Sequence, residues 1–131
     1  MHYRALLNPT DFIGPQDCDS PFTATISRVV REVVQEGKPE KAPIMYFKNG
    51  EGEAPKKFKV PKSVMYGLSL TFGNDVDTWV GQTIELYKAW CMSFGEEEEC
   101  VRVRFAPDID TKIRKWLKKR GASPNAYMII K

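Results

Sequence analysis

Residues 75–87, DVDTWVGQTIELY, carry the pattern that decides the fold of this chain. Within positions 83–87 apolar and polar side chains alternate, which is the period of a strand with one buried face. Gly81 precedes that strand, and a residue without a Cβ allows the chain to turn sharply there. We expect Trp79 to fill the core beneath the turn. The stretch therefore predicts a joint where a helix ends and a strand begins.

The segments before this joint alternate between strand patterns and turn signals. Residues 23–34 have an apolar spacing that also fits a helix, but their density of Thr, Ile and Val favours a long strand with a bulge near residues 28–30. Lys48-Asn49-Gly50 is a hairpin-type turn signal, and Gly73 is a suitable helix stop. The elements expected before the joint are strands at 23–34, 44–47 and 56–60, a polar loop at 35–43, and a helix at 63–72.

Beyond the joint, a hairpin and a final helix are expected. Asp108 or Asp110 is suited to cap that helix, and its apolar stripe consists of Ile109, Ile113, Trp116 and Leu117. Residues 127–130 are apolar and would form an added strand or contact a partner. The expected elements are strands at 83–91 and 100–105, a loop at 93–99 that includes the four glutamates at positions 96–99, and a helix that ends near Arg120.

The order strand, strand, strand, helix, strand, strand is that of the OB-fold, a five-stranded Greek-key barrel. The predicted fold is therefore mainly β, a β-β-β-α-β-β barrel followed by a basic amphipathic helix. An open α+β sandwich with the same elements is the alternative. Within a single domain, we assign residues 1–22 to an irregular lead-in, 23–106 to the barrel, and 107–131 to the C-terminal helix and tail.

Several motifs resemble a family of small phage and prophage proteins. The most distinctive is the DxWVGxxIxLY segment, and the resemblance covers roughly residues 10–105. It implies an OB-like fold and a role in phage replication or recombination through binding of single-stranded DNA. Gln82, the glutamates at 96–99 and the extra basic helix depart from the family pattern. The other matching motifs are Lys56-Phe58-Val60, Phe72-Gly73-Asn74-Asp75, Val101-Arg102-Val103-Arg104 and the lead-in Phe12-Ile13-Gly14-Pro15-Gln16-Asp17.

Composition excludes several classes of function. The chain has 131 residues and a net charge of +3, with three cysteines and one histidine. No CxxC spacing is present, so we expect no zinc site and no other metal or cofactor. With His2 as the only histidine, no nucleophile, base and orienting group can be assembled, and we expect no enzyme activity. No apolar run has the length of a signal peptide or membrane span, which predicts a cytoplasmic setting, in the host cell if phage-encoded.

Single-strand binding requires positive charge along a groove and aromatic faces on which bases can stack. Tyr46 or Phe47 supplies a ring, depending on the register of the second strand. Phe58, Phe72, Trp79, Phe105 and Trp116 are expected in the core, where strand aromatics usually lie. The candidate nucleic-acid-binding residues are Tyr46, Lys48, Lys57, Lys59, Lys62, Tyr87, Trp90, Arg102, Arg104, Lys112, Lys115 and Lys119.

Two hypotheses follow from these patterns. The first is a non-catalytic protein that binds single-stranded DNA, and RNA as a further possibility, with little sequence preference; an oligomer is compatible with it. The second is a protein-interaction module that docks on a host or replication protein through the acidic hairpin, the basic helix or the apolar tail. A virion structural component built on the same barrel is a third interpretation.

Overall fold

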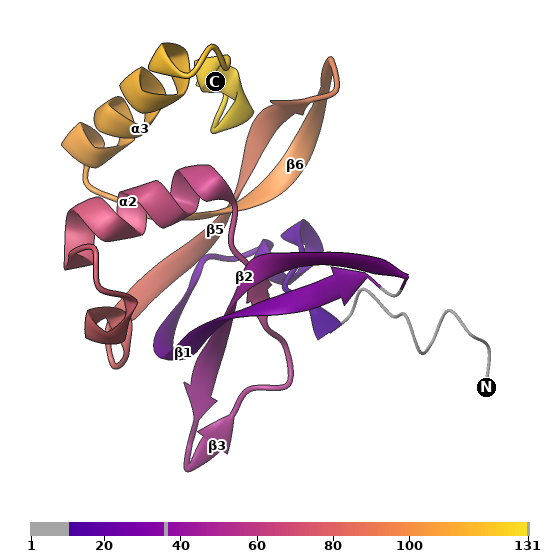
Figure 1. Cartoon of the computed structure of the whole chain (residues 1–131), viewed down its shortest axis with the longest axis vertical. Helices are drawn as coiled ribbons and strands as arrows, with labels where there is room; N and C mark the ends of the chain where they lie inside the picture. The colour runs from indigo at the N-terminus through magenta and orange to yellow at the C-terminus, as the bar shows by residue number, and fades with distance from the viewer. Residues whose placement is uncertain (1–10, 36, 131) are drawn as a thin grey trace.

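The computed structural model describes residues 11–35 and 37–130, in which six strands and two α-helices are arranged as in Figure 1. Two helices, α2 and α3, pack against each other along one side of a curved sheet. In chain order the elements are η2 (Pro15–Cys18), β1 (Phe22–Gln35), β2 (Lys38–Asn49), β3 (Gly52–Glu53), β4 (Phe58–Lys59), α2 (Lys62–Phe72), η3 (Val76–Trp79), β5 (Thr83–Ser93), β6 (Glu96–Val103), α3 (Pro107–Lys119) and η4 (Pro124–Ala126).

All strand pairings in the sheet are antiparallel. The strand order is β3-β2-β1-β5-β6, and β4 pairs with β2 off this path. The sheet does not close on itself, because no pairing joins β4 to β6 within residues 11–35 and 37–130. The prediction of a mainly β fold is confirmed, as is the chain order of the main strands and helices. The short strand β3 was not predicted.

The β1–β2 hairpin is much longer than its sequence suggests. Residues 23–34 do form a strand, and the first register shift opposite β2 falls at Ser27, one residue before the predicted bulge. The predicted polar loop at 35–43 is wrong, because β2 already begins at Lys38. Pairing with β1 supplies hydrogen-bond partners to this polar segment, which can keep its side chains in solvent. Gly37, at φ 81°, lies in the turn.

The β5–β6 hairpin also extends further than expected. The glutamates at positions 96–99 were predicted to lie in a loop, and this is wrong, since they pair with residues 90–93 of β5. The turn contains only Phe94 and Gly95, with φ 52° and 81°. Positive φ at both central residues is the geometry of a tight two-residue hairpin turn. Backbone pairing therefore overrides the low strand propensity of glutamate here.

Both helices occupy the predicted places, but the expected cap of α3 is wrong. Neither Asp108 nor Asp110 caps it: the N-cap is Ala106, Pro107 is the first helical residue, and the two aspartates lie in the first turn. Proline suits this position because the first N–H groups of a helix have no partner within the helix. Gly73 ends α2 with φ 102°, as predicted.

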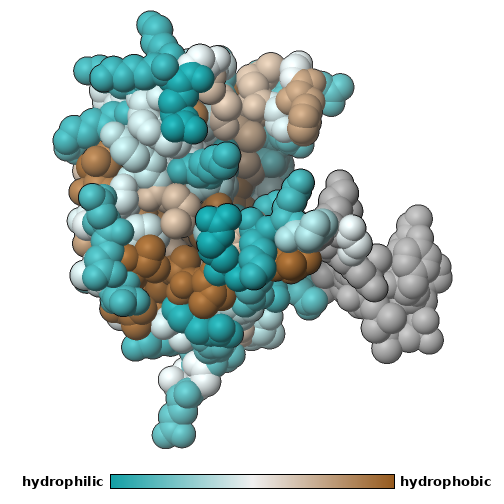
Figure 2. All heavy atoms as spheres, viewed as in Figure 1, coloured by the Kyte–Doolittle hydropathy of each residue, from teal (hydrophilic) through white to brown (hydrophobic). Residues whose placement is uncertain are grey.

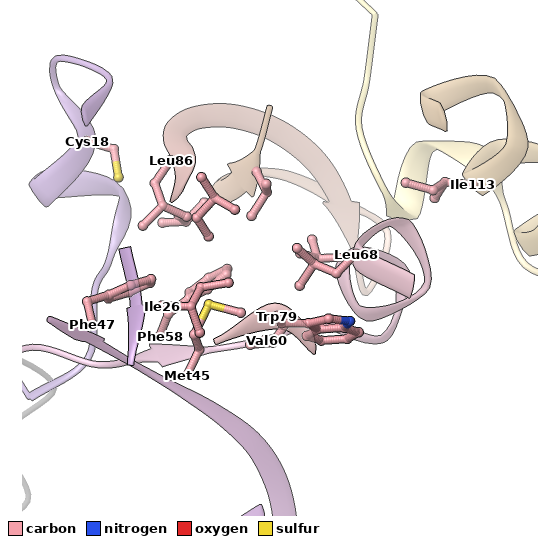
Figure 3. Packing of buried hydrophobic residues seen from close by; sticks show 14 of the residues in the cluster. Cys18, Ile26, Met45, Phe47, Phe58, Val60, Leu68, Trp79, Leu86 and Ile113 are labelled. Carbon is pink, nitrogen blue, oxygen red and sulfur yellow. The ribbon is translucent and has the colours of Figure 1, made fainter. Parts of the chain in front are cut away.

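The joint that the sequence marks contributes Trp79, Ile84 and Leu86 to the hydrophobic core, part of which is drawn in Figure 3. Trp79 is 1% exposed, and its Nε1 donates a hydrogen bond to the Gly73 carbonyl at 2.8 Å, which holds the end of α2 against η3. Phe58 and Trp79 are core residues as predicted, while Phe72 and Phe105 are partly buried against the core. The prediction that Trp116 belongs to the core is wrong, because Trp116 is only partly buried and lies outside the core cluster and the side chains packed against it.

The C-terminal tail docks on β5 and does not add a strand. Tyr127 is completely buried, and the Ile129 N–H donates to the Trp90 carbonyl at 2.7 Å. Within the part of the chain that the structure describes, no helix is long and apolar enough to cross a membrane.

Candidate functional site

A groove of about 650 Å³ lies between the β1–β2 hairpin, β4 and the two helices. Its floor is formed by apolar side chains that include Val60, Met65 and Trp79. No carboxylate of the described residues lines it. Five cationic residues do, and they are Arg31, Lys41, Lys59, Lys62 and Arg120.

Each of these cations is placed by a different part of the fold. Arg31 of β1 lies opposite Pro43 of β2, and its Nη2 donates to the Lys41 carbonyl at 3.4 Å, so the hairpin brings both positive charges to one rim. Lys59 is fixed by the pairing of β4 with β2. Lys62 opens α2, and Arg120 follows the last residue of α3.

A pair of aromatic rings separates this groove from a second hollow. Tyr66 of α2 and Trp116 of α3 stack with their centroids 4.6 Å apart and their planes inclined by 13°. The Arg120 guanidinium lies 4.8 Å from the Trp116 ring centroid. The same two rings line the second hollow, of about 230 Å³, together with the lysines of one face of α3, which are Lys112, Lys115 and Lys119. Spacings of three and four residues place these lysines on one side of the helix.

We call the two hollows together the basic groove, and its eight cations have no acidic partner among the described residues. None of them forms a salt bridge with a carboxylate of the described residues. Five other basic side chains near the sheet are paired instead: Arg28 with Glu53, Lys56 with Asp17, Lys57 with Glu32, Lys88 with Asp19 and Glu99, and Arg104 with Glu85. Unpaired cations that share a concave surface sum to a positive potential that attracts anions.

Five of the predicted site residues, Lys59, Lys62, Lys112, Lys115 and Lys119, come together in the basic groove. Figure 2 shows hydrophobic patches bordered by hydrophilic atoms on the face where Figure 1 places α2, α3 and the β1–β2 hairpin. A surface of this kind can hold phosphate groups at its rim and flat apolar groups against its rings.

Tyr46 and Lys57 lie outside the basic groove, in a cluster whose charges are balanced. Phe47 is 3% exposed, so the register of β2 puts Phe47 in the core and Tyr46 outside it. The Tyr46 hydroxyl donates to Glu32 at 2.6 Å, and the Arg28 guanidinium lies 3.7 Å from its ring centroid. Burial, then the Glu32 hydrogen bond, raise the pKa of Tyr46. One face of this ring is thus already occupied by a cation.

Lys48 is exposed and lies opposite Glu53 in the β2–β3 pairing. It borders a third hollow, of about 440 Å³, whose lining also contains the Asp17–Lys56 salt bridge at 2.6 Å. Lys48 is therefore not grouped with the lysines of the basic groove.

Tyr87, Trp90 and Arg104 lie on the β5–β6 hairpin. The Arg104 guanidinium lies 4.1 Å from the Tyr87 ring centroid and its Nε donates to Glu85 at 2.5 Å. Burial raises the pKa of Tyr87, and its hydroxyl donates to the Met128 sulfur at 3.5 Å. The Trp90 side chain is 38% exposed. None of the three borders the basic groove.

The expected position of Arg102 on an open outward face is wrong. Arg102 is 5% exposed, because the C-terminal tail covers this face of β6. Its guanidinium donates to three backbone carbonyls: Nε to Tyr127 at 2.6 Å, Nη1 to Val101 at 2.8 Å and Nη2 to Ala126 at 3.3 Å. Arg102 thus holds the tail to the sheet.

Sequence reasoning missed Arg31, Lys41 and Tyr66, and it assigned Trp116 to the core; it noted Arg120 only as one of the basic residues of the final helix. Lys41 falls in a segment that was predicted to be a loop. Arg31 falls in a strand that was predicted from its apolar residues, so its own charge was not considered. The spacing of Tyr66 on α2 and Trp116 on α3 carried no signal that the two rings meet. A helix with six basic residues within positions 112–120 was the available indication of a charged surface.

Comparison with protein-family models, with curated proteins and with solved structures finds no match to this chain.

Proposed function

We propose that the chain is a non-catalytic protein that binds single-stranded nucleic acid, DNA in the first place and RNA as a further ligand. The observation that carries this proposal is the basic groove, with eight cations free of acidic partners on either side of the stacked Tyr66–Trp116 pair.

The chemistry of the groove suits a strand of unpaired nucleotides. Lysine and arginine bind the phosphates, and binding releases counterions from the nucleic acid. A base can stack on the exposed part of the Tyr66–Trp116 pair, which favours a single strand because the bases of a duplex are already stacked. Apart from its cations the groove presents few hydrogen-bonding side chains, Ser69 and Asn74 among them. Stacking and charge distinguish bases poorly, so we expect little sequence preference.

We further propose that the sheet is a partly open version of the OB-fold. In support, β1 pairs with both β2 and β5, β2 pairs with β4, and β5 pairs with β6, around a helix inserted between β4 and β5. A closed barrel of this topology would also need β4 to pair with β6. The resemblance to phage proteins supports the same fold, and it is the basis for proposing a role in phage replication or recombination in the host cytoplasm.

The test is the binding of a fluorescently labelled single-stranded oligonucleotide, measured by anisotropy over a salt series. Lys59→Gln/Lys62→Gln removes two cations of the groove. For single strands the slope of log affinity against log salt is roughly −0.7 per phosphate contact, so we expect the slope to become shallower by about 1.4. Lys56→Gln/Lys88→Gln is the matched control, because it removes the same charge from lysines that already have acidic partners.

A third variant, Lys48→Gln/Lys57→Gln, tests the strand face that the sequence analysis favoured. If it weakens binding more than Lys59→Gln/Lys62→Gln, the binding surface has been misplaced. Absence of binding at low salt, equal affinity for a duplex of the same length, or an affinity that does not change with salt would contradict the proposed function.

A second candidate function is a protein-interaction module that docks on a host or replication protein. It is favoured by two large apolar side chains left in solvent, Phe94 at the end of the β5–β6 hairpin and Ile130 in the tail. Capture of one host protein that resists nuclease treatment and is lost with Phe94→Ala would support it. If nuclease treatment abolishes the capture, the host protein is held through nucleic acid, and the first proposed function explains the result.

A further inference from the structure

The end of the β5–β6 hairpin has properties that its own fold does not use. The Phe94 side chain is 104% exposed, and its φ of 52° places a bulky residue in the left-handed region. Glycine or asparagine would occupy that position at lower conformational cost. An aromatic side chain that is both exposed and conformationally unfavourable at a turn indicates a contact outside the fold.

The strand that follows this turn is strongly acidic. All four glutamates at positions 96–99 are exposed. Glu99 lies 3.9 Å from Lys88, whereas Glu96 and Glu98 form no salt bridge with the described residues. Glu96 and Glu98 are two residues apart, so they project from one face of β6. The hairpin therefore presents an aromatic ring next to a row of carboxylates.

The basic groove is complementary to this end of the hairpin both in charge and in its aromatic rings. It holds eight cations without acidic partners, and its two rings are partly exposed. Its lining comes from β1, β2, β4, α2, η3 and α3, and no residue of β5 or β6 takes part. Since the hairpin does not reach the groove of its own chain, the complementary surface can be met only in another molecule.

We propose that the hairpin end of one copy, Phe94 with Glu96 and Glu98, docks in the basic groove of a second copy. Phe94 would lie against the Tyr66–Trp116 pair, and the carboxylates would lie near Lys59 and Lys62. The contact joins two different surfaces, so it is a head-to-tail contact that produces rings or open chains of copies. This contact uses the same groove that we propose for nucleic-acid binding, but the contact itself does not require nucleic acid.

The test is sedimentation velocity of the full chain without nucleic acid, over a concentration series at about 50 mM and about 500 mM salt. We expect concentration-dependent association at the lower salt, weakened about tenfold or more at the higher salt because exposed charge pairs are screened. Glu96→Gln/Glu98→Gln should abolish the association. The matched control Glu51→Gln/Asp108→Asn removes two other exposed carboxylates, which make no salt bridge with the described residues, and should leave the association intact.

Charge reversal provides the decisive comparison. Glu96→Lys/Glu98→Lys and Lys59→Glu/Lys62→Glu should each remain monomeric alone, because each sets like charges against each other. Mixed in equal amounts, they should associate again, since each then offers the other an oppositely charged surface. Circular dichroism of each variant checks that these exposed substitutions leave the fold intact.

A wild-type chain that stays monomeric at low salt at all concentrations would overturn the proposal, and so would a mixture of the reversed variants that fails to associate. Neither result bears on nucleic-acid binding, which is measured separately. If both proposals hold, adding a single-stranded oligonucleotide should disperse the assemblies, because the two ligands compete for one groove. Loss of association with the matched control would indicate a general charge effect and would also refute the specific contact.

Discussion

Replacement of Arg102 by methionine should destabilise the protein and release its C-terminal tail. The side chain is 5% exposed, and its guanidinium donates to the carbonyls of Val101, Ala126 and Tyr127. Methionine has a comparable length and no charge, so Arg102→Met removes the donors without opening a large cavity. The carbonyls of the tail would then either stay buried without partners or move into solvent.

Either outcome has a similar free-energy cost. A buried carbonyl left without a partner costs about 1–3 kcal/mol. If the tail detaches instead, the completely buried Tyr127 leaves the core, which loses about 1.5–3 kcal/mol of apolar burial. Removing a buried charge returns part of this, so we expect the free energy of unfolding to fall by about 1–3 kcal/mol. At roughly 2.1 cal/mol/K of unfolding entropy per residue, Tm should fall by about 4–11 °C.

Arg104→Met is the matched control, two residues further along the same chain. Arg104 is half-exposed and pairs with Glu85, and exposed ion pairs contribute less than about 1 kcal/mol. Denaturant unfolding would measure both variants, and hydrogen exchange at the Ile129 amide, which donates to the Trp90 carbonyl, would report on the tail. If Arg102→Met lies within 1 kcal/mol of wild type and the Ile129 amide stays protected, Arg102 does not hold the tail as described.

Three further predictions concern the binding rings, the helix contact and the response to acid. Trp116→Ala should weaken binding of a single-stranded oligonucleotide by about 1–3 kcal/mol, measured by anisotropy, and a change below twofold would exclude base stacking there. Gly67→Ala should destabilise by about 1–3 kcal/mol in denaturant unfolding despite the gain in helix propensity, because the new Cβ would lie 2.5 Å from the Phe105 ring. Gly52→Ala should be neutral, because a Cβ there would make only an ordinary contact, 3.9 Å from the Asn49 carbonyl oxygen. The Gly14 N–H, and then Lys56, lower the pKa of Asp17, so its stabilisation is present above the ordinary pKa of 3.8 and is lost as the pH falls through the lowered value. Unfolding measured from neutral to acidic pH should show the gap between wild type and Asp17→Asn closing in acid, and a constant gap would contradict this.

The elements that the sequence predicts well are those in which local pattern and tertiary packing agree. The helix at 63–72, its stop at Gly73, the Trp79 core residue and the strand from Thr83 all occur as expected. Both predicted loops failed for one physical reason. The segments at 35–43 and 96–99 are polar, but each pairs along its backbone with a neighbouring strand, and such pairing depends on the hairpin and not on local propensity.

The candidate site was less predictable because its parts come from elements far apart in the sequence. Lys57 and Lys59 have the same sequence pattern, yet Lys57 lies 3.8 Å from Glu32, while Lys59 has no acidic partner and lines the groove. Arg102 and Arg104 alternate identically with valines, yet only Arg102 is covered by the tail. What distinguishes the members of each pair is what the rest of the chain places over them, and no local pattern carries that information.

Positive and negative side chains lie on different parts of the molecule, and the net charge of +3 does not show this separation. Near the sheet, Arg28, Lys56 and Lys57 are each neutralised by an acidic neighbour. Eight cations that form no salt bridge with the described residues lie in the basic groove, and Glu96 and Glu98, which also form none with them, lie at the end of the β5–β6 hairpin. If both proposals hold, a molecule so divided should attract polyanions and also its own copies, and both attractions should weaken with salt. We therefore expect Glu96→Gln/Glu98→Gln to raise the affinity for an oligonucleotide more than Glu51→Gln/Asp108→Asn does. The difference would measure how strongly the hairpin of one molecule competes for the groove of another.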